Sequence, residues 1–162
     1  MVVDDLASLR ADAIVRPATT RLDPTAAALR RLESVGGDEF QRHLRLSREL
    51  PVGAAVVTAA GGDLPADFVI HAVIRSETEP VTKDGVARAW RAALHQAQEW
   101  QFAHVTAPPL GTGAGNLALE DAATIMATIL SQHGASWPAD VTFVVERDED
   151  RAAFEAALRS PA

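Results

Sequence analysis

The sequence contains no cysteine, a single lysine and no long hydrophobic segment. Without cysteine the chain forms no disulfide, no Cys-ligated zinc site, no iron–sulfur cluster and no catalytic thiolate. No apolar run approaches the roughly 20 residues that a helix needs to span a bilayer. The first residues, MVVDD, lack the basic and apolar regions of a secretory signal. We therefore expect a soluble, cytoplasmic protein that does not enter membranes.

Positive charge is also scarce. The chain has 22 acidic residues against 15 lysines and arginines, and its formal net charge is -7. Because affinity for the phosphate backbone comes mainly from clustered Lys and Arg, we expect no general nucleic-acid binding. The five histidines show no pair at i, i+4 and no HExxH motif, and the acids have no convincing metal-ligand spacing. The sequence therefore predicts neither a metal site nor a cofactor.

The chain does contain short, β-branched segments that alternate with amphipathic ones. Strands are predicted at residues 12–16, 54–59, 68–74, 104–107 and 141–146, with residues 1–3 as the stub of another. Each is mostly apolar on both faces, which is typical of central strands covered by helices. With 162 residues, a single domain over residues 1–162 fits better than two.

Helices are expected between these strands. One runs from Asp84, taken as its N-cap, past Trp90 to Ala97, and a second carries apolar residues from Ala122 to Leu130 and stops at Gly134. A third begins at Asp148, and two weaker ones lie around Leu29 and Leu44. Strands that alternate with helices favour an α/β fold.

A glycine-rich segment, PPLGTGAGN at residues 108–116, lies between a predicted strand and a predicted helix. Glycines let the backbone approach a ligand closely, and the N–H groups and the following helix N-terminus favour an anion. A tight turn that needs glycine only for its dihedral angles explains the same pattern. A dinucleotide fingerprint would need a glycine where Asn116 stands, and a P-loop would need a lysine.

Two histidines and two acids have alternative explanations. His71 lies inside the apolar run FVIHAVI, which favours a buried, hydrogen-bonded structural histidine over a ligand or base. His104 precedes a predicted strand and is expected at the surface. Asp4 and Asp5 either lie on a solvated turn or supply a carboxylate that accepts a hydrogen bond from a ligand amine.

Five segments, in sequence order, resemble the macro domain, an ADP-ribose-binding module. They are VDDL at 3–6 (family Gly-Asp-Ile), DAIVRPAT at 12–19 ("DAIVNPAN"), GAAVVT at 53–58 with LPADFVIHAV at 64–73 ("GEAVVT…LPAKYVIHTV"), the loop at 109–116, and LEDAA at 119–123 ("LEEAA"). The resemblance covers nearly the whole chain. It implies a three-layer α/β/α sandwich with a mixed central sheet.

The resemblance also implies a ligand-binding set. Asp5, with its neighbour Leu6, matches the Asp that accepts the adenine amine. The diphosphate-cradling loop of the family matches Gly111, Thr112, Gly113, Ala114, Gly115 and Asn116. The implied ligand is ADP-ribose or a related nucleotide, free or attached to ADP-ribosylated macromolecules.

Several departures from the family fall in this implied pocket. Arg16 and Thr19 occupy the two Asn positions, of which the second helps to hold the distal ribose and supports catalysis in the hydrolases. The family's first glycine-rich loop matches LDPTAA at 22–27, which has no glycine. Arg16 either contacts a phosphate or carboxylate or fills the cleft. Glu146 replaces an aromatic or apolar residue beside adenine.

Three functions stay open from the sequence, and the catalytic residues are not identified. The first is a module that binds ADP-ribose or a related adenine nucleotide diphosphate, with weak or no hydrolase activity. The second is a hydrolase that removes ADP-ribose from modified substrates. The third is a degenerate macro fold that serves as a non-catalytic interaction module.

Overall fold

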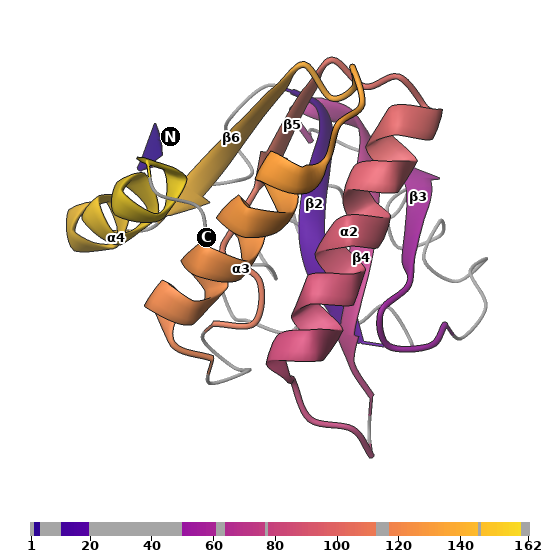
Figure 1. Ribbon diagram of the computed structural model, residues 1–162. Helices are drawn as coiled ribbons and strands as arrows, with labels where there is room; N and C mark the ends of the chain where they lie inside the picture. Colours follow the sequence, from indigo (N-terminus) through magenta and orange to yellow (C-terminus); the bar gives the residue numbers. More distant parts are fainter. Residues whose placement is uncertain are drawn as a thin grey trace.

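The computed structural model describes residues 2–3, 11–19, 50–60, 64–76, 78–112, 117–145 and 147–159. The strands are β1 (Val2–Val3), β2 (Ala11–Thr19), β3 (Ala55–Ala59), β4 (Ala66–Arg75), β5 (His104–Ala107) and β6 (Asp140–Val145). The helices are α2 (Lys83–Glu99), α3 (Leu119–Gln132) and α4 (Asp148–Arg159). The described strands form one sheet in the order β1-β6-β5-β2-β4-β3 (Figure 1).

The sheet is mixed, as expected. Among the described strands, the neighbouring pairs β1–β6, β6–β5, β5–β2 and β2–β4 are parallel, and only β3 runs antiparallel, against β4. The predicted strands are all present, but β2 and β4 extend further than expected. In β2 the pairing continues through Pro17, opposite Ala72, as far as Thr19. The φ that a proline ring fixes is compatible with extended backbone, so Pro17 does not end the strand.

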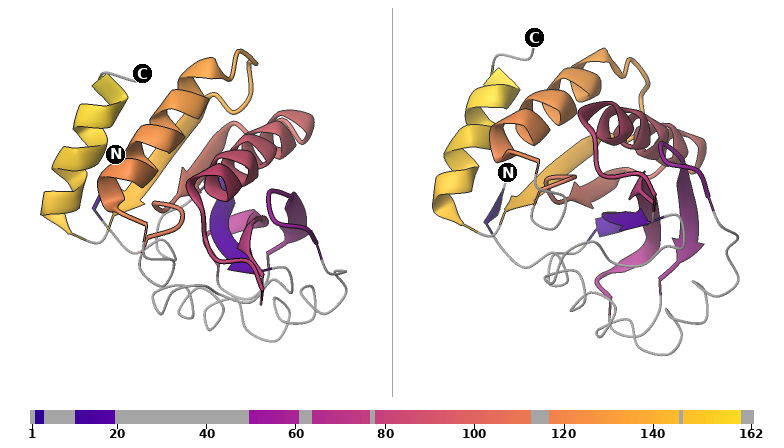
Figure 2. Two further views of the ribbon diagram at one scale, coloured as in Figure 1. Left: turned by 60° about the horizontal axis from the view of Figure 1, so that its bottom comes forward. Right: turned by 90° about the horizontal axis from the view of Figure 1, so that it is seen from below.

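The described helices lie on one side of the sheet. α2 and α3 run side by side across it (Figure 1), and α4 packs against α3 (Figure 2). Their apolar stripes bury the large residues Trp90, Leu94 and Phe154 against strand residues such as Ile70 and Phe143. The α/β class is therefore confirmed. The helices expected around Leu29 and Leu44, which would supply the other layer, lie outside the described residues.

The predicted N-cap of α2 was wrong. Thr82 is the N-cap: it has an extended backbone (φ -128°), and its Oγ1 accepts a hydrogen bond from the Gly85 N–H at 2.9 Å. Asp84 lies in the first turn instead, where its carboxylate receives the Arg88 Nε–H at 3.0 Å. The start of α4 at Asp148 is confirmed.

Parallel pairing brings the carboxyl ends of β2, β4, β5 and β6 to one edge of the sheet. α2 follows β4 and α3 follows β5, so both helices begin at this same edge. It is the lower edge in Figure 1 and is seen end-on in the right-hand view of Figure 2. In α/β sheets of this kind, ligands bind beyond the carboxyl ends of the strands.

Candidate functional site

The carboxyl edge of the sheet carries three of the four predicted site residues that the structure describes, and the fourth, Arg16, lies behind this edge. Thr19 ends β2, and Gly111 and Thr112 follow β5. The other predicted ligand residues are not among the described ones: Asp5, Leu6, Gly113, Ala114, Gly115 and Asn116. Residues 22–27 and Glu146 also lie outside the described residues. Their predicted roles stay predictions.

The segment after β5 turns sharply at Gly111. This residue has φ +87°, and a Cβ placed on it would lie 2.9 Å from Val86 Cγ2 and 3.0 Å from Leu117 Cδ2. Glycine is therefore required both by its dihedral angle and by the close packing against α2. The Gly111 carbonyl accepts a hydrogen bond from the Leu117 N–H at 2.9 Å, which closes the base of the loop just before α3.

The two helices that begin at this edge differ in how their N-termini are capped. The N-terminus of α2 is capped by Thr82, whereas the N-cap of α3 is Ala118, which has no side-chain acceptor to offer. The first backbone N–H groups of a helix have no intrahelical partner, so an uncapped N-terminus leaves donors for a ligand or water. Lys83 Nζ lies 3.5 Å from Asp121 Oδ2 and links the two helix starts.

Behind the edge, Arg16 and His71 form a buried pair between β2 and β4. Neither side chain has exposed surface, and Arg16 Nε donates to His71 Nδ1 at 2.7 Å. Because guanidinium only donates, Nδ1 is the acceptor and the ring proton sits on Nε2. Nε2 then donates to Thr58 Oγ1 on β3, also at 2.7 Å. A hydrogen-bonded chain thus crosses three strands.

The environment of this pair keeps His71 neutral. Burial, and secondarily the charge of Arg16, lower the pKa of His71 well below its ordinary 6.5. The prediction that His71 is a buried, hydrogen-bonded structural residue is confirmed. Of the two roles considered for Arg16, filling space agrees with its full burial, and a ligand contact stays a prediction.

The prediction that His104 precedes its strand was wrong. It is the first residue of β5, paired with Asp140 of β6, and it is half-buried. Its Nε2 lies 2.9 Å from Thr142 Oγ1 on the neighbouring strand. β5 occupies the predicted residues 104–107, so His104 begins the strand and pairs within it instead of preceding it. Within the described residues, no group of three or more His, Asp and Glu could hold a metal ion.

One residue at the edge was not predicted from the sequence. Arg75 is the last residue of β4 and pairs with Thr19 across a β-bulge, since Ala18 pairs with Val73 and one residue of β4 is skipped. Arg75 is half-buried, and its side chain makes no hydrogen bond or ion pair with the residues that the structure describes. The available signal was its place at the carboxyl end of an apolar run.

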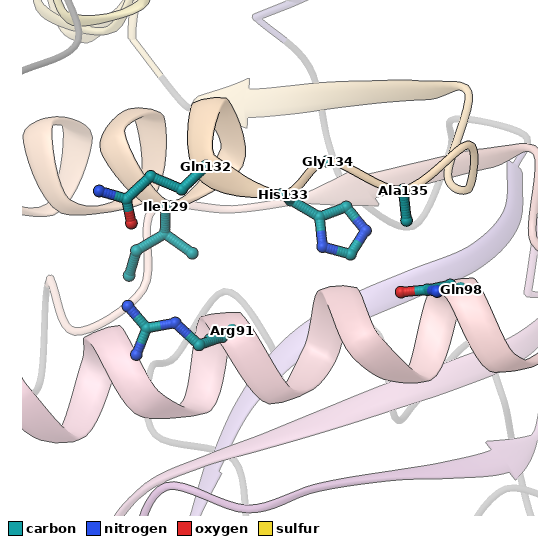
Figure 3. A pocket seen from close by; sticks show the side chains of 7 residues that line it. All are labelled: Arg91, Gln98, Ile129, Gln132, His133, Gly134 and Ala135. Atoms are coloured by element: carbon teal, nitrogen blue, oxygen red, sulfur yellow. The ribbon is translucent and has the colours of Figure 1, made fainter.

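A cavity of about 230 Å³ lies elsewhere, between the C-terminal halves of α2 and α3 (Figure 3). It is lined mainly by exposed or half-exposed side chains: Arg91, Gln98, Ile129, Gln132, His133, Gly134 and Ala135. Because the helices begin at the carboxyl edge of the sheet and the cavity lies toward their other ends, it is separate from the candidate site.

The chain is similar to known proteins over nearly its whole length. The family model for the Macro domain matches residues 15–126, more than two thirds of the chain. An uncharacterized protein of Mycobacterium tuberculosis is 33% identical over 96% of this chain, which spans only 43% of that relative. No helix among the described residues is long and apolar enough to cross a membrane.

Two solved structures share the fold. A Trypanosoma brucei macrodomain in complex with ADP-ribose superposes with a TM-score of 0.82 at 21% identity, over 97% of this chain and 68% of that one. An Oceanobacillus iheyensis macrodomain with ADP gives a TM-score of 0.82 at 22% identity, over 98% and 88% of the two chains. At these identities the likeness establishes the fold.

Proposed function

The chain belongs to the macro domain family, and on this basis we propose that it binds ADP-ribose or a related adenine nucleotide diphosphate at the carboxyl edge of its sheet. We further propose that residues 1–162 act as a single domain. The activity of any longer protein of which this domain is a part is also a proposal, since the chain spans less than half of its mycobacterial relative.

The observation that carries the proposal is the loop after β5. Its first turn requires glycine at Gly111, its base is closed by the Leu117 N–H, and it leads into the uncapped N-terminus of α3. Backbone donors and a helix N-terminus together favour an anion such as a diphosphate. The ligands named for the two solved macrodomains, ADP-ribose and ADP, both carry this group.

The strand order suggests how such a ligand would lie. Asp5 follows β1, the glycine loop follows β5 and Thr19 ends β2, and these strands occur in that order across the sheet. We assign Asp5 and Leu6 to the adenine end, residues 111–116 to the diphosphate and Thr19 to the distal group. Arg16, fully buried and bonded to His71, supports this edge from behind.

We propose binding with weak or no hydrolysis. In the family's hydrolases the second Asn helps to fix the distal ribose, and here Thr19 stands at that position. Correct positioning of reacting groups contributes several kcal/mol to lowering a barrier, so its loss is expected to reduce turnover strongly. Modified macromolecules would then be ligands of the domain more than its substrates.

Calorimetric titration with ADP-ribose, ADP and AMP tests the proposal. The wild-type chain is expected to bind ADP-ribose and ADP more tightly than AMP, and Gly113→Glu is expected to abolish the heat by adding bulk and negative charge to the loop. Gly134→Glu is the matched control, because a Cβ on Gly134 meets no atom within 4 Å. Failure of the wild type to bind any of the three nucleotides would refute nucleotide binding.

If the Gly113→Glu variant binds as well as the wild type, the ligand does not use this loop. Thermal unfolding of both variants checks that each is folded before the affinities are compared. Incubation of wild type with a mono-ADP-ribosylated protein tests the hydrolysis claim, and release of ADP-ribose that Gly113→Glu prevents would overturn it.

A further inference from the structure

Arg75 is a cation at the carboxyl edge whose charge the described residues do not neutralise. It is half-buried, and no described carboxylate lies within ion-pair distance of it. Glu77 lies outside the described residues. The first described acid after β4 is Glu79, whose backbone N–H and carbonyl both form hydrogen bonds with Ser76. A half-buried guanidinium whose donors are not taken up by the described residues is well suited to an anionic ligand group.

The backbone next to Arg75 is irregular at the same point. Thr19 pairs with Arg75 only because one residue of β4 is skipped between this pair and the preceding Ala18–Val73 pair. Such bulges re-aim a side chain and occur often beside functional sites. The irregularity brings Arg75 level with Thr19, the last residue of β2, which is proposed to face the distal group of the nucleotide.

The strand order fixes the place of Arg75 relative to the phosphate loop. β4 is two strands from β5, with β2 between them. At a spacing of about 4.8 Å between strands, the ends of β5 and β4 are roughly 10 Å apart. A ligand whose diphosphate occupies the loop after β5 therefore meets Thr19 next and Arg75 last.

From this placement we infer that the distal part of the site binds a phosphate group and not only a sugar, with Arg75 as its counter-ion. The favoured ligand class is an adenine nucleotide that carries a further phosphate beyond the diphosphate, such as a nucleoside triphosphate. The inference rests on the proposed function, since it takes the diphosphate to lie in the loop after β5. Arg75 acts here as a specificity-determining residue.

Titration of the full chain with ADP, ATP and ADP-ribose, with EDTA present to remove divalent cations, tests the inference. ATP is expected to bind about tenfold more tightly than ADP, because a charge-assisted contact to the added phosphate is worth about that factor. Arg75→Ala is expected to remove this advantage while changing ADP affinity much less. If the alanine variant does not fold, Arg75→Gln provides the same test, because glutamine keeps a polar side chain but removes the charge.

Arg91→Ala is the matched control. Arg91 is an exposed arginine of α2 whose side chain makes no hydrogen bond or ion pair with described residues, and it lines the separate cavity of Figure 3. It removes the same charge, so the ATP advantage should persist. Loss of the advantage in Arg91→Ala would mean that net charge, not a contact, is responsible, and would overturn the inference.

Two further results separate this inference from the proposed function. If ADP binds but ATP binds no more tightly, or if Arg75→Ala weakens both nucleotides equally, the inference fails and the proposed function stands. If neither ADP nor ADP-ribose binds the wild type, both fail together.

Discussion

The two faces of the sheet are built from different chemistry. The face under α2 and α3 is apolar, with residues such as Val15, Ile70 and Val105 packed against the helices. The residues that alternate with these point to the opposite face, and many of them are also apolar, such as Ile14 and Val73. This second face, called the polar face below, also carries Arg16, His71 and Thr106. These three are the buried polar or charged residues among those that the structure describes.

From this difference we expect one face of the sheet mainly to stabilise the fold and the other to make the specific polar contacts. Apolar burial on the helix-covered face stabilises the fold without fixing any chemistry. Buried polar groups on the other face stabilise only while their hydrogen bonds are made, because an unpaired buried group costs free energy. The Arg16–His71 pair lies on this face, directly behind the edge at which we place the nucleotide.

The largest effect is expected on the apolar face, at Trp90. Its side chain is fully buried, its Nε1 donates to the Met126 carbonyl at 3.0 Å, and its ring lies 5.9 Å from that of Phe143. Trp90→Ala should lower the free energy of unfolding by about 4 kcal/mol through lost burial and a cavity. Urea denaturation followed by circular dichroism measures this.

Trp100 offers the control for that variant. It lies at the C-cap of the same helix and is 50% exposed. Trp100→Ala should cost about 1 kcal/mol, since only its ring contacts with Phe68 and Phe102 are lost. Equal destabilisation by the two variants would show that the covered face is not the main source of stability.

On the polar face, His71→Leu should be the most damaging change. It removes the acceptor of Arg16 Nε in a site without solvent, and breaking such a contact to a buried charge costs about 3 kcal/mol. His71→Gln should recover part of this loss, because its amide oxygen can accept from the guanidinium. His104→Leu, which removes a half-buried histidine bonded to Thr142, should cost only about 1 kcal/mol.

An unchanged urea midpoint in His71→Leu would contradict the view that the polar face depends on this pair. A leucine variant that is stable while the glutamine variant is not would contradict it equally.

The contrast between the faces explains what the sequence could predict. Apolar β-branched runs located every strand, and glycine with an apolar periodicity located the loop after β5, because these signals are local. The N-cap of α2 was misplaced because Thr82 and Asp84 are both good capping residues, and only the backbone conformation distinguishes them.

Contacts between residues that are far apart in the sequence could not be predicted from the sequence. Arg16 and His71 are 55 positions apart, and only the register of β2 against β4 brings them together. The sequence therefore placed Arg16 in the pocket without identifying His71 as its partner. Arg75 was missed for the same reason, because only the positions of its neighbours in space reveal that no described residue pairs with its side chain.

The polar face should also make stability depend on pH. The pKa of folded His71 is held below its ordinary 6.5 by burial and by Arg16, so the unfolded chain binds the proton more readily. Stability from the neutral ring is complete above about pH 6.5 and falls as the pH drops below it, by at most about 1.4 kcal/mol per pH unit.

Urea denaturation at intervals from pH 7.5 to 5 measures this slope in the wild type and in His71→Gln. The glutamine variant does not titrate, so the difference in unfolding free energy between the two proteins should shrink as the pH falls. Parallel curves would mean that His71 is not kept neutral in the folded state.

The smallest effect is expected at Thr106, on the central strand β5. Its Oγ1 is buried and has no hydrogen-bond partner among the described residues, unlike the nitrogens of His71. Thr106→Val has nearly the same shape and removes an unsatisfied hydroxyl, so the free energy of unfolding should rise or stay within about 1 kcal/mol of the wild-type value. A loss of 2 kcal/mol or more on urea denaturation would show that this hydroxyl has a partner in solution. The polar face would then include a second hydrogen-bonded group beside the Arg16–His71 pair.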